Sequence, residues 1–428
     1  MTYGIDLGTT NSLWAVGDKC SGLYPSIVDL DTGMVGESQR MNLKAKRSFK
    51  VDISMSKDGA VSIMASSKVL ETIKRDIDSN DVVISVPAYF TDNQREATKE
   101  AARIAGLNVK ALINEPTAAA MYLARDSRKI SVVFDLGGGT FDISVIDSRF
   151  DTYDVQATEG CNIGGDDFDA AIYRHMLNVL NIGEHQLDPE DRALFKILCS
   201  KAKIEVQKNG RSDIDLSEYG HQKVFTLDEQ TYKTIMKSVF FRCLAITKDV
   251  IAKNIENGEV FDIILVGGST RCPYLREWIG NELGQEPIEV NYDPDKVVAQ
   301  GAALYASIVD QGLVNEVVSD VTKQLGVALS DGTVQPIILQ NSKIPTEETV
   351  SMHNAYDAEY LEVALYQGES ALASNNEKIG VLKYKYSEPK LAGMGLVDVT
   401  VKVDNSGLIT LEVAELLGDP VSIEIVRW

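Results

Sequence analysis

Apolar and polar positions divide the first part of the chain into short strands and tight turns, and one arrangement occurs twice. The apolar runs TYGI and LWAV flank the turn DLGTTN, and the runs VVF and ISVI flank the turn DLGGGTFD. Glycine-containing turns between short apolar runs are typical of β-hairpins, with glycine where the backbone turns or approaches a ligand closely. The pattern therefore predicts two similar hairpins.

Each hairpin is followed by a strand and then a helix. DVVISVPAYF leads into a helix that has Thr91 and Gln94 at capping-box spacing and Gly106 as a stop, and DIILVGGST has the same layout. An acidic-proline turn then opens an alanine-rich helix in each copy, INEPTAAAMYLA and NYDPDKVVAQGAALYA. Four landmarks in one order predict two homologous α/β lobes, with mixed sheets and helices on their faces.

The pattern of apolar and polar residues changes at two more places along the chain. Residues 184–249 show helical periodicity around a polar, strand-like patch, which predicts an insertion in the second lobe. From residue 321 onward period-2 alternation replaces helical period, with a hairpin turn at Asp404–Gly407, so we expect a small all-β sandwich.

The predicted organisation has two lobes, a connector and a sandwich. We expect lobe I at about 1–125, lobe II at about 126–312, an interdomain linker at 313–320 and the sandwich at 321–428, with no helical lid after it.

Length, charge and cysteine content exclude several classes of protein. A chain of 428 residues is long for one core. It has no apolar run of membrane-spanning length and no signal-peptide pattern, so we expect a cytoplasmic protein with no membrane partner. A net charge of −21 argues against nucleic acid, and five cysteines without a CxxC pair argue against zinc or a disulfide framework. We expect a monomer.

The hairpin tips carry the first candidate chemistry. Their backbone N–H groups and hydroxyls suit a polyphosphate, and pseudo-symmetric lobes would hold it from both sides. These candidates are Gly8, Thr9, Thr10, Asn11, Gly137, Gly138, Gly139 and Thr140. Asp6 and Asp135, at the hairpin entrances, are placed to hold Mg²⁺ through its waters. One such turn alone is usually just a turn, but two in register favour a phosphate site.

Hydrolysis of a phosphate also needs a group that orients the attacking water. Glu115, Asp142 and Lys50 are the candidates, and Asp142 shares a strand face with Thr140. Glu115 also has a simpler reading as a helix-dipole partner, and Lys50 as part of a solvated basic stretch. The run Gly267–Arg271, which ends a strand and opens a helix, suits a nucleotide's sugar, base or α-phosphate.

Together these motifs resemble the DnaK-type (seventy-kilodalton) heat-shock chaperones. The similarity covers nearly the whole chain, through GIDLGTTNS, VPAYF, INEPTAAA, FDLGGGTFDISV, GGDDFD, ILVGGSTR, DPDKVVAQGAA and YQGE. The resemblance implies a two-lobed actin-like ATPase domain with ribonuclease-H-like lobes, followed by a peptide-binding β-sandwich.

The resemblance also implies roles for matching residues. Thr9, Thr10 and Asn11 would hold phosphates together with residues 137–140. Thr140 would also be one of the catalytic residues. Asp6, Asp135 and Asp142 would order Mg²⁺ and K⁺, and Lys50 and Glu115 would position the water. The remaining implied nucleotide contacts are Gly164, Gly165, Lys203, Gly267, Gly268, Ser269, Arg271 and Asp295. Implied partners are extended peptide segments, a J-domain co-chaperone and a nucleotide exchange factor.

The sequence departs from this family at several places. Ser200 replaces a glutamate and Gln207 a common serine, both adenine contacts, so we expect low nucleotide affinity or altered base preference. The first-lobe insertion is short. The linker, Val317, Val318 and Asp320 among its residues, is less apolar than the usual leucine run and should dock more weakly. Ala111 stands where many members have an arginine tied to J-domain coupling.

The sequence therefore favours a chaperone relative that binds and slowly hydrolyses ATP, with weak or altered coupling between its ATPase domain and a lidless peptide-binding domain. Val363, Leu365 and Tyr366 are candidates for a peptide groove, with ordinary sandwich core as the alternative for each. A nucleotide-sensing interaction module with little ATP turnover is the second hypothesis. A filament-forming actin relative is disfavoured by the appended sandwich.

Overall fold

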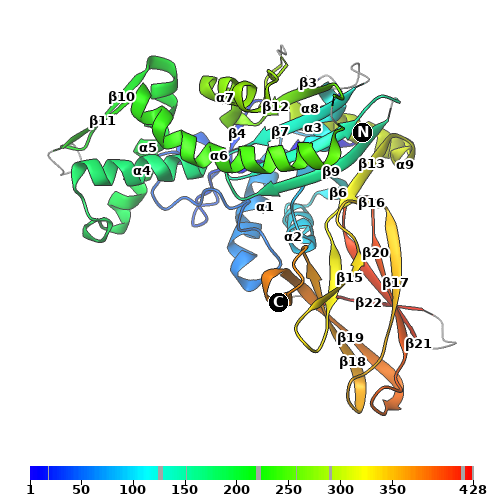
Figure 1. The fold of residues 1–428 in the computed structure, drawn as a ribbon. Helices are drawn as coiled ribbons and strands as arrows, with labels where there is room; N and C mark the ends of the chain where they lie inside the picture. Colours follow the sequence, from blue (N-terminus) through cyan, green and yellow to red (C-terminus); the bar gives the residue numbers. More distant parts are fainter. Residues whose placement is uncertain are drawn as a thin grey trace.

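The chain forms an α/β body from which a narrow β-rich region extends (Figure 1). The computed structural model describes residues 1–17, 19–123, 129–150, 152–217, 223–256, 258–288, 292–415 and 420–426. The lobe boundary expected near residue 125 lies outside these ranges. Within them, no helix is both long enough and apolar enough to cross a membrane.

The first lobe is built on a mixed sheet with the order β3-β2-β1-β5-β6, and β4 also pairs with β2. Its strands are β1 Tyr3–Asp6, β2 Asn11–Val16, β3 Lys19–Cys20, β4 Tyr24–Pro25, β5 Asp81–Val86 and β6 Asn108–Asn114. Its helices are α1 Ala60–Lys74, α2 Asp92–Ile104 and α3 Glu115–Leu123, with short 3-10 turns at Glu37–Gln39 and Lys57–Gly59. The predicted capping box of α2 is present, since Gln94 Oε1 accepts from the Thr91 amide at 3.1 Å.

The second lobe repeats the hairpin and the parallel strand beside it. β7 Ile130–Leu136 and β8 Phe141–Asp147 form the predicted antiparallel hairpin, and β12 Phe261–Val266 lies parallel to β7, as β5 lies parallel to β1. The sheet has the order β12-β7-β8-β9-β13-β16. Its other strands are β9 Tyr153–Cys161, β13 Val318–Thr322 and β16 Ser342–Ile344.

Helices cover this lobe and join it to the first. They are α4 Gly165–Leu180, α5 Pro189–Asn209, α6 Glu229–Asn254, α7 Pro273–Leu283, α8 Val297–Gln311 and α9 Val314–Val317, with 3-10 turns Glu184–Gln186 and Gly268–Arg271. Helix α8 packs directly on β1, because a Cβ at Gly4 would lie 2.2 Å from the Ala303 nitrogen. Close approach of this kind requires glycine.

The expected insertion is helical around a polar hairpin, as its sequence pattern predicts. β10 Arg211–Asp215 and β11 Val224–Asp228 pair between α5 and α6. The Asp188 and Asp228 side chains cap the two helices, and Gly210 ends α5 in the left-handed conformation.

The β-rich region is a sandwich of two four-stranded sheets with the orders β15-β14-β18-β19 and β17-β20-β21-β22. The strands are β14 Leu325–Ala328, β15 Val334–Ile338, β17 Thr346–Met352, β18 Ala358–Gln367, β19 Glu377–Lys390, β20 Val397–Val403, β21 Ile409–Glu415 and β22 Val421–Ile423, with a 3-10 turn at Ala373–Asn375. Alternate residues of β20 and β21 are buried between the sheets, as the period-2 pattern predicts.

The end of the linker forms a strand of the second-lobe sheet. Val318 and Ser319 pair in parallel with β9, so β13 extends the second-lobe sheet, and its far end pairs with β16. Val318 is buried, and β13 runs past the sandwich boundary expected at 321. The linker is therefore docked through main-chain pairing, which does not need an apolar side chain at every position. Its weak docking relative to the family stays a prediction.

The sandwich also rests on the first lobe. The Asp92 carboxylate accepts from the Ile409 amide at 2.9 Å, and the Gln367 side chain accepts from the Asp92 amide at 3.1 Å. The Arg95 guanidinium donates to the Ser406 carbonyl at 3.1 Å. The sandwich thus makes polar contacts with the N-terminal part of α2, through Asp92 and Arg95, and we call this contact region the sandwich seat.

Candidate functional site

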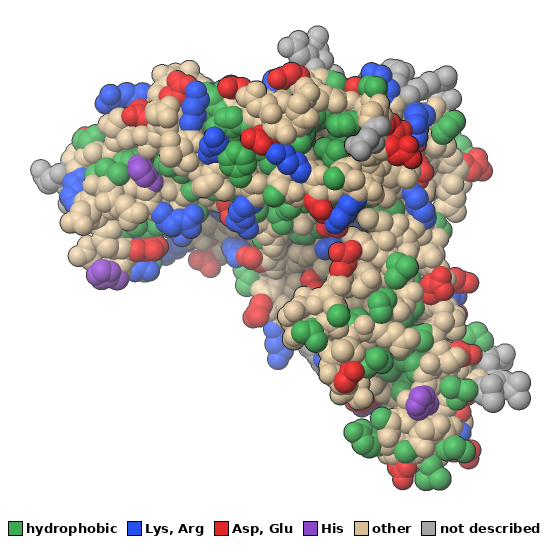
Figure 2. Space-filling model, in the orientation of Figure 1, with side chains coloured by type: hydrophobic (Ala, Val, Ile, Leu, Met, Phe, Trp, Pro, Cys, Tyr) green, Lys and Arg blue, Asp and Glu red, His purple; other side chains and the backbone are tan. Residues whose placement is uncertain are grey.

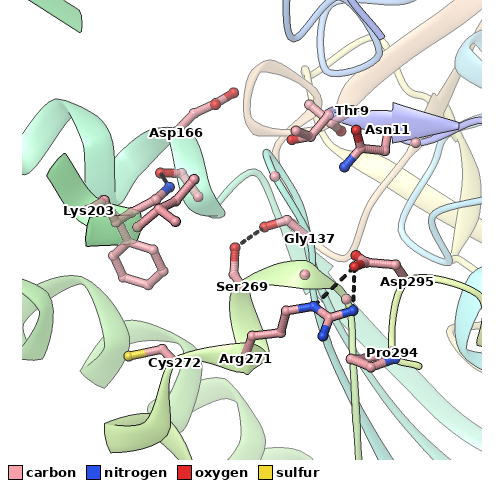
Figure 3. A pocket seen from close by; sticks show the side chains of 18 of the residues that line it. Thr9, Asn11, Gly137, Asp166, Lys203, Ser269, Arg271, Cys272, Pro294 and Asp295 are labelled. Carbon is pink, nitrogen blue, oxygen red and sulfur yellow. Dashed lines mark hydrogen bonds and ion pairs between the residues drawn. The ribbon is translucent and has the colours of Figure 1, made fainter. Parts of the chain in front are cut away.

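The two hairpin tips face each other across a cleft between the lobes. A Cβ at Gly138 would lie 2.0 Å from Thr10 Oγ1, and one at Gly139 would lie 3.0 Å from Thr9 Cγ2. Only glycine permits this approach. The tips border a cavity of about 500 Å³ that residues of both lobes line, and Figure 3 shows Thr9 and Asn11 across from Lys203, Ser269 and Arg271.

The structure brings most of the predicted nucleotide residues to this cavity. The lining includes Gly8, Thr9, Thr10, Asn11, Gly137, Gly138, Thr140, Gly165, Lys203, Gly267, Gly268, Ser269, Arg271 and Asp295. Gly139 and Gly164 lie behind the lining and pack on each other, since a Cβ at Gly164 would be 2.5 Å from the Gly139 nitrogen. These two glycines shape the tip rather than face the cavity.

Lys50 reaches the base of the cleft and pairs with Glu115 in a buried ion pair. Arg47 organises the short loop before it, donating to the carbonyls of Gln39 at 3.1 Å and Arg40 at 2.8 Å. Glu115 begins α3, so its carboxylate lies at a helix N-terminus as well as in the cleft. Lys50 is buried, so the alternative that it belongs to a solvated basic stretch is wrong.

A cluster of buried carboxylates surrounds this pair. Asp135 and Asp142 are buried and Asp6 is half-buried, all three near Glu115, with Lys50 as the neighbouring cation. Burial, then the charge of Glu115, raise the pKa of Asp6 to about 7 and that of Asp142 to about 8, and raise the pKa of Asp135 well above its ordinary value. Ionising these carboxyls is therefore costly without a cation beside them, and bound cations would favour their charged form.

The donor set suits a hydrated magnesium ion. The Ser85 hydroxyl donates to Asp6 at 3.0 Å, whereas the buried Asp142 Oδ2 has no hydrogen-bond partner among the described residues. Within that part of the chain, no three His, Cys, Asp or Glu side chains converge as a direct metal cage. Carboxylates that hold Mg²⁺ through its waters do not need such a cage.

The opposite wall of the cavity is held by polar contacts between elements. The Ser269 hydroxyl donates to the Gly137 carbonyl at 2.7 Å, which fixes the turn before α7 against the second hairpin. Arg271 donates twice to Asp295, at 3.0 and 2.6 Å (Figure 3). Lys203 pairs with Asp169 at 2.8 Å and donates to the Gly165 carbonyl at 3.0 Å.

The two departures in α5 both line the cavity. Ser200 offers a short hydroxyl there. The Gln207 amide donates to the Tyr232 hydroxyl, so part of its hydrogen-bonding capacity is already used.

Sequence reasoning missed several residues of the cavity wall. Arg40, Asp166, Phe168, Tyr232 and Met236 line it as well. Asp166 accepts from the Ser48 hydroxyl of the other lobe. Asp166 and Phe168 lie within the quoted motif GGDDFD, which was the available signal, but nothing local marks Tyr232 or Arg40.

The candidate groove residues lie on two faces of β18. Leu365 is buried in the sandwich core and Val363 packs against that core, whereas Tyr366 is the next residue along the strand and points to the other face. Leu365 is therefore an ordinary residue of the sandwich core, which was the alternative to a role in a peptide groove. Asp320 of the linker is buried and accepts from the Thr117 hydroxyl at 3.0 Å.

Two α/β lobes that close on a cavity with one hairpin each, followed by a β-sandwich, define an actin-like ATPase class of protein. Comparison with known proteins agrees. The family model for Hsp70 protein matches residues 39–425. The Chaperone protein DnaK of Halobacterium salinarum, in each of two strains, is 33% identical over 96% of this chain and 72% of its own length. The chain therefore belongs to the Hsp70 family, whose members are ATPases.

Proposed function

We propose that this protein is an ATP-dependent chaperone that binds and slowly hydrolyses ATP with Mg²⁺ and K⁺ and couples this to binding of extended peptide segments. The observation that carries the proposal is the contact of the two hairpin tips beside a buried acidic cluster. Such an arrangement holds a polyphosphate between two sets of backbone N–H groups and keeps cations next to it.

Different residues of the cleft have different proposed roles in binding and hydrolysis. Thr9, Thr10 and Thr140 present hydroxyls to the phosphates, and the Lys50–Glu115 pair orients the attacking water. Asp6, Asp135 and Asp142 would hold Mg²⁺ and K⁺, and these ions when bound would supply positive charge next to the phosphates.

Binding at the far wall would select the nucleoside. Gly267, Gly268, Ser269 and Arg271 contact the sugar and base, and Lys203 adds a cation near Gly165. Gln207 and Ser200 line this part of the cavity and give it a polarity different from that of the family pattern.

The docked linker supports coupling to the sandwich. β13 joins the edge of the second-lobe sheet, and Asp320 is bonded to α3, the helix that Glu115 begins. A rotation of one lobe against the other therefore changes the seat of the sandwich. Release of the linker would free the sandwich and alter its hold on a peptide.

The peptide surface that we propose lies at the far end of the sandwich. The loops after β17 and β19 are joined there by Asn354, whose side-chain amide donates to the Leu391 carbonyl at 2.9 Å and accepts from the Gly395 amide at 2.8 Å. Tyr356, Leu391 and Met394 on these loops are largely exposed, and Figure 2 shows apolar side chains at this end. Exposed apolar side chains on braced loops suit an extended apolar segment.

The test is ATP-dependent peptide release by the full chain. We expect a fluorescent apolar peptide to dissociate at least several-fold faster with ATP and Mg²⁺ than with ADP, while single-turnover measurements detect phosphate. Hydrolysis without a change in release would remove the coupling and leave an ATPase. Nucleotide binding without hydrolysis would favour a nucleotide-sensing interaction module, for which the Gln207–Tyr232 contact is the supporting observation.

J-domain co-chaperones and nucleotide exchange factors are the partners that we propose for such a cycle. Because Ala111 lies on β6 beside the sandwich seat, its small side chain would leave a J-domain less to contact. Size-exclusion chromatography tests the proposed monomer.

A further inference from the structure

Lys323 is the first residue after the linker strand β13, and its ammonium lies over a ring of the first lobe. Its Nζ is 5.6 Å from the centre of the Tyr89 ring, a cation–π distance. The side chain is half-buried. Among the described residues no carboxylate lies within 4.0 Å of this ammonium.

Tyr89 also contacts the acidic cluster and the second lobe. Its backbone amide donates to Asp142 Oδ1 at 3.2 Å, and its hydroxyl donates to Asn162 Oδ1 at 2.5 Å. Both acceptors belong to the second lobe. A Cβ at Gly160 would lie 2.8 Å from Tyr89 Cδ1 and 3.0 Å from Asp142 Oδ1, so Tyr89 is wedged between the lobes.

Charges from the sandwich and from the second lobe act on the Lys323 ammonium. Burial lowers the pKa of Lys323, while Glu377 of the sandwich and Glu159 of the second lobe favour its charged form. Gln340, also of the sandwich, donates to Glu159 at 3.3 Å. Because Lys323 directly follows β13, a displacement of the linker would take its ammonium away from the Tyr89 ring.

We propose that Lys323 is a positioning residue for the hydrolysis reaction, which holds Tyr89, and through its amide Asp142, only while the sandwich is docked. The inference rests on the proposed ATPase function. Lys323 touches no reacting atom in this arrangement. It acts through Tyr89, which links the docked state of the sandwich to the geometry of the acidic cluster.

The test compares Lys323→Met with Lys323→Arg in the full chain. Methionine keeps an unbranched stem and removes the charge, whereas arginine keeps the cation and stacks on aromatic rings. Lys385→Met is the matched control, because Lys385 lies 5.8 Å from the Tyr360 ring on an exposed strand of the sandwich. Two readouts are needed: single-turnover ATP hydrolysis, and hydrogen exchange of the Tyr89 amide.

We expect Lys323→Met to lower the hydrolysis rate constant about tenfold with KM unchanged, and to speed exchange of the Tyr89 amide by a similar factor. Lys323→Arg should restore both, and Lys385→Met should change neither. The inference would be overturned if the Tyr89 amide exchanged in Lys323→Met at the wild-type rate. It would also be overturned if Lys323→Arg did not restore the wild-type exchange rate.

The exchange readout separates this inference from the proposed function. If the wild-type protein hydrolyses no ATP, the proposed ATPase fails, while exchange at Tyr89 still decides whether Lys323 holds that residue. Should Lys323→Met fail to fold, Lys323→Gln keeps a polar side chain at the half-buried position and is judged by the same two outcomes.

Discussion

Lys50 and Glu115 form a buried ion pair although 65 residues separate them in the sequence. One comes from the short first-lobe insertion and the other from the start of α3. Both residues line the cavity between the lobes, together with the hairpin tips and with Asp6 and Asp135 of the acidic cluster.

Replacing Glu115 with glutamine should nearly abolish hydrolysis. The amide keeps the shape but loses the charge that orients water, so we expect kcat to fall about 100-fold or more, with ATP binding changed much less. Single-turnover hydrolysis and equilibrium binding of ATP measure the two effects. Glu71→Gln, which alters a half-buried ion pair with Lys68 on α1 outside the cleft, is the control. Equal rates for both variants would contradict the role of Glu115.

Adding one methyl group at Gly138 should separate the hairpin tips. A Cβ there would meet Thr10 Oγ1 at 2.0 Å, so the tips must move apart and the phosphate contacts weaken. We expect Gly138→Ala to raise the Kd for ATP about tenfold or more. Gly22→Ala is the control, since a Cβ at Gly22 has no heavy atom within 4 Å. Isothermal titration measures both, and unchanged affinity in Gly138→Ala would argue against the two-sided clamp.

A charge at Val318 should release the linker. Val318 is buried where β13 pairs with β9, and a carboxylate there is expensive to desolvate. We expect Val318→Asp to make residues 313–322 at least tenfold more sensitive to limited proteolysis and to remove any effect of ATP on peptide release. Val260→Asp, at a largely exposed valine, should do neither. Equal cleavage of the two variants would show that burial of Val318 does not hold the linker.

The far end of the sandwich should govern peptide affinity. Met394→Asp places a charge among the exposed apolar side chains there, and we expect binding of an apolar peptide to weaken about tenfold. Leu339→Asp is the control, because Leu339 is also exposed on the sandwich but lies outside these loops. Fluorescence anisotropy distinguishes them. Equal weakening by both variants would point to a general charge effect instead.

The acidic cluster predicts a pH-dependent stability. Burial and Glu115 raise the pKa of Asp6 to about 7 and that of Asp142 to about 8. Aspartate in the unfolded chain has a pKa of about 4. The folded state therefore holds more protons between about pH 4 and 8, so these groups make the metal-free protein less stable as pH rises through that window.

We accordingly expect the Tm in EDTA to fall between pH 6 and pH 8.5, and to fall less in Asp142→Asn than in the exposed control Asp398→Asn. Mg²⁺ with ADP should reduce the fall, because bound cations stabilise the ionised carboxylates. An identical decline in both variants would exclude Asp142 as a source of the pH dependence.

Local chemistry in the sequence determined the elements and their kind. Glycine in the hairpin turns, the Thr91–Gln94 capping box and the period-2 pattern of the sandwich each act within a few residues, so they are readable without tertiary contacts. The repeat of the hairpins was enough to predict two lobes whose hairpin tips face each other across a cleft.

Only the tertiary structure decided which distant residues meet. The ion pair of Lys50 with Glu115, the pairing of Val318 with β9 and the position of Lys323 over Tyr89 join segments whose spacing in the sequence carries no periodic signal. Likewise, Leu365 and Tyr366 are neighbours in the chain but face opposite sides of a strand, so burial could be assigned only after the two sheets had packed.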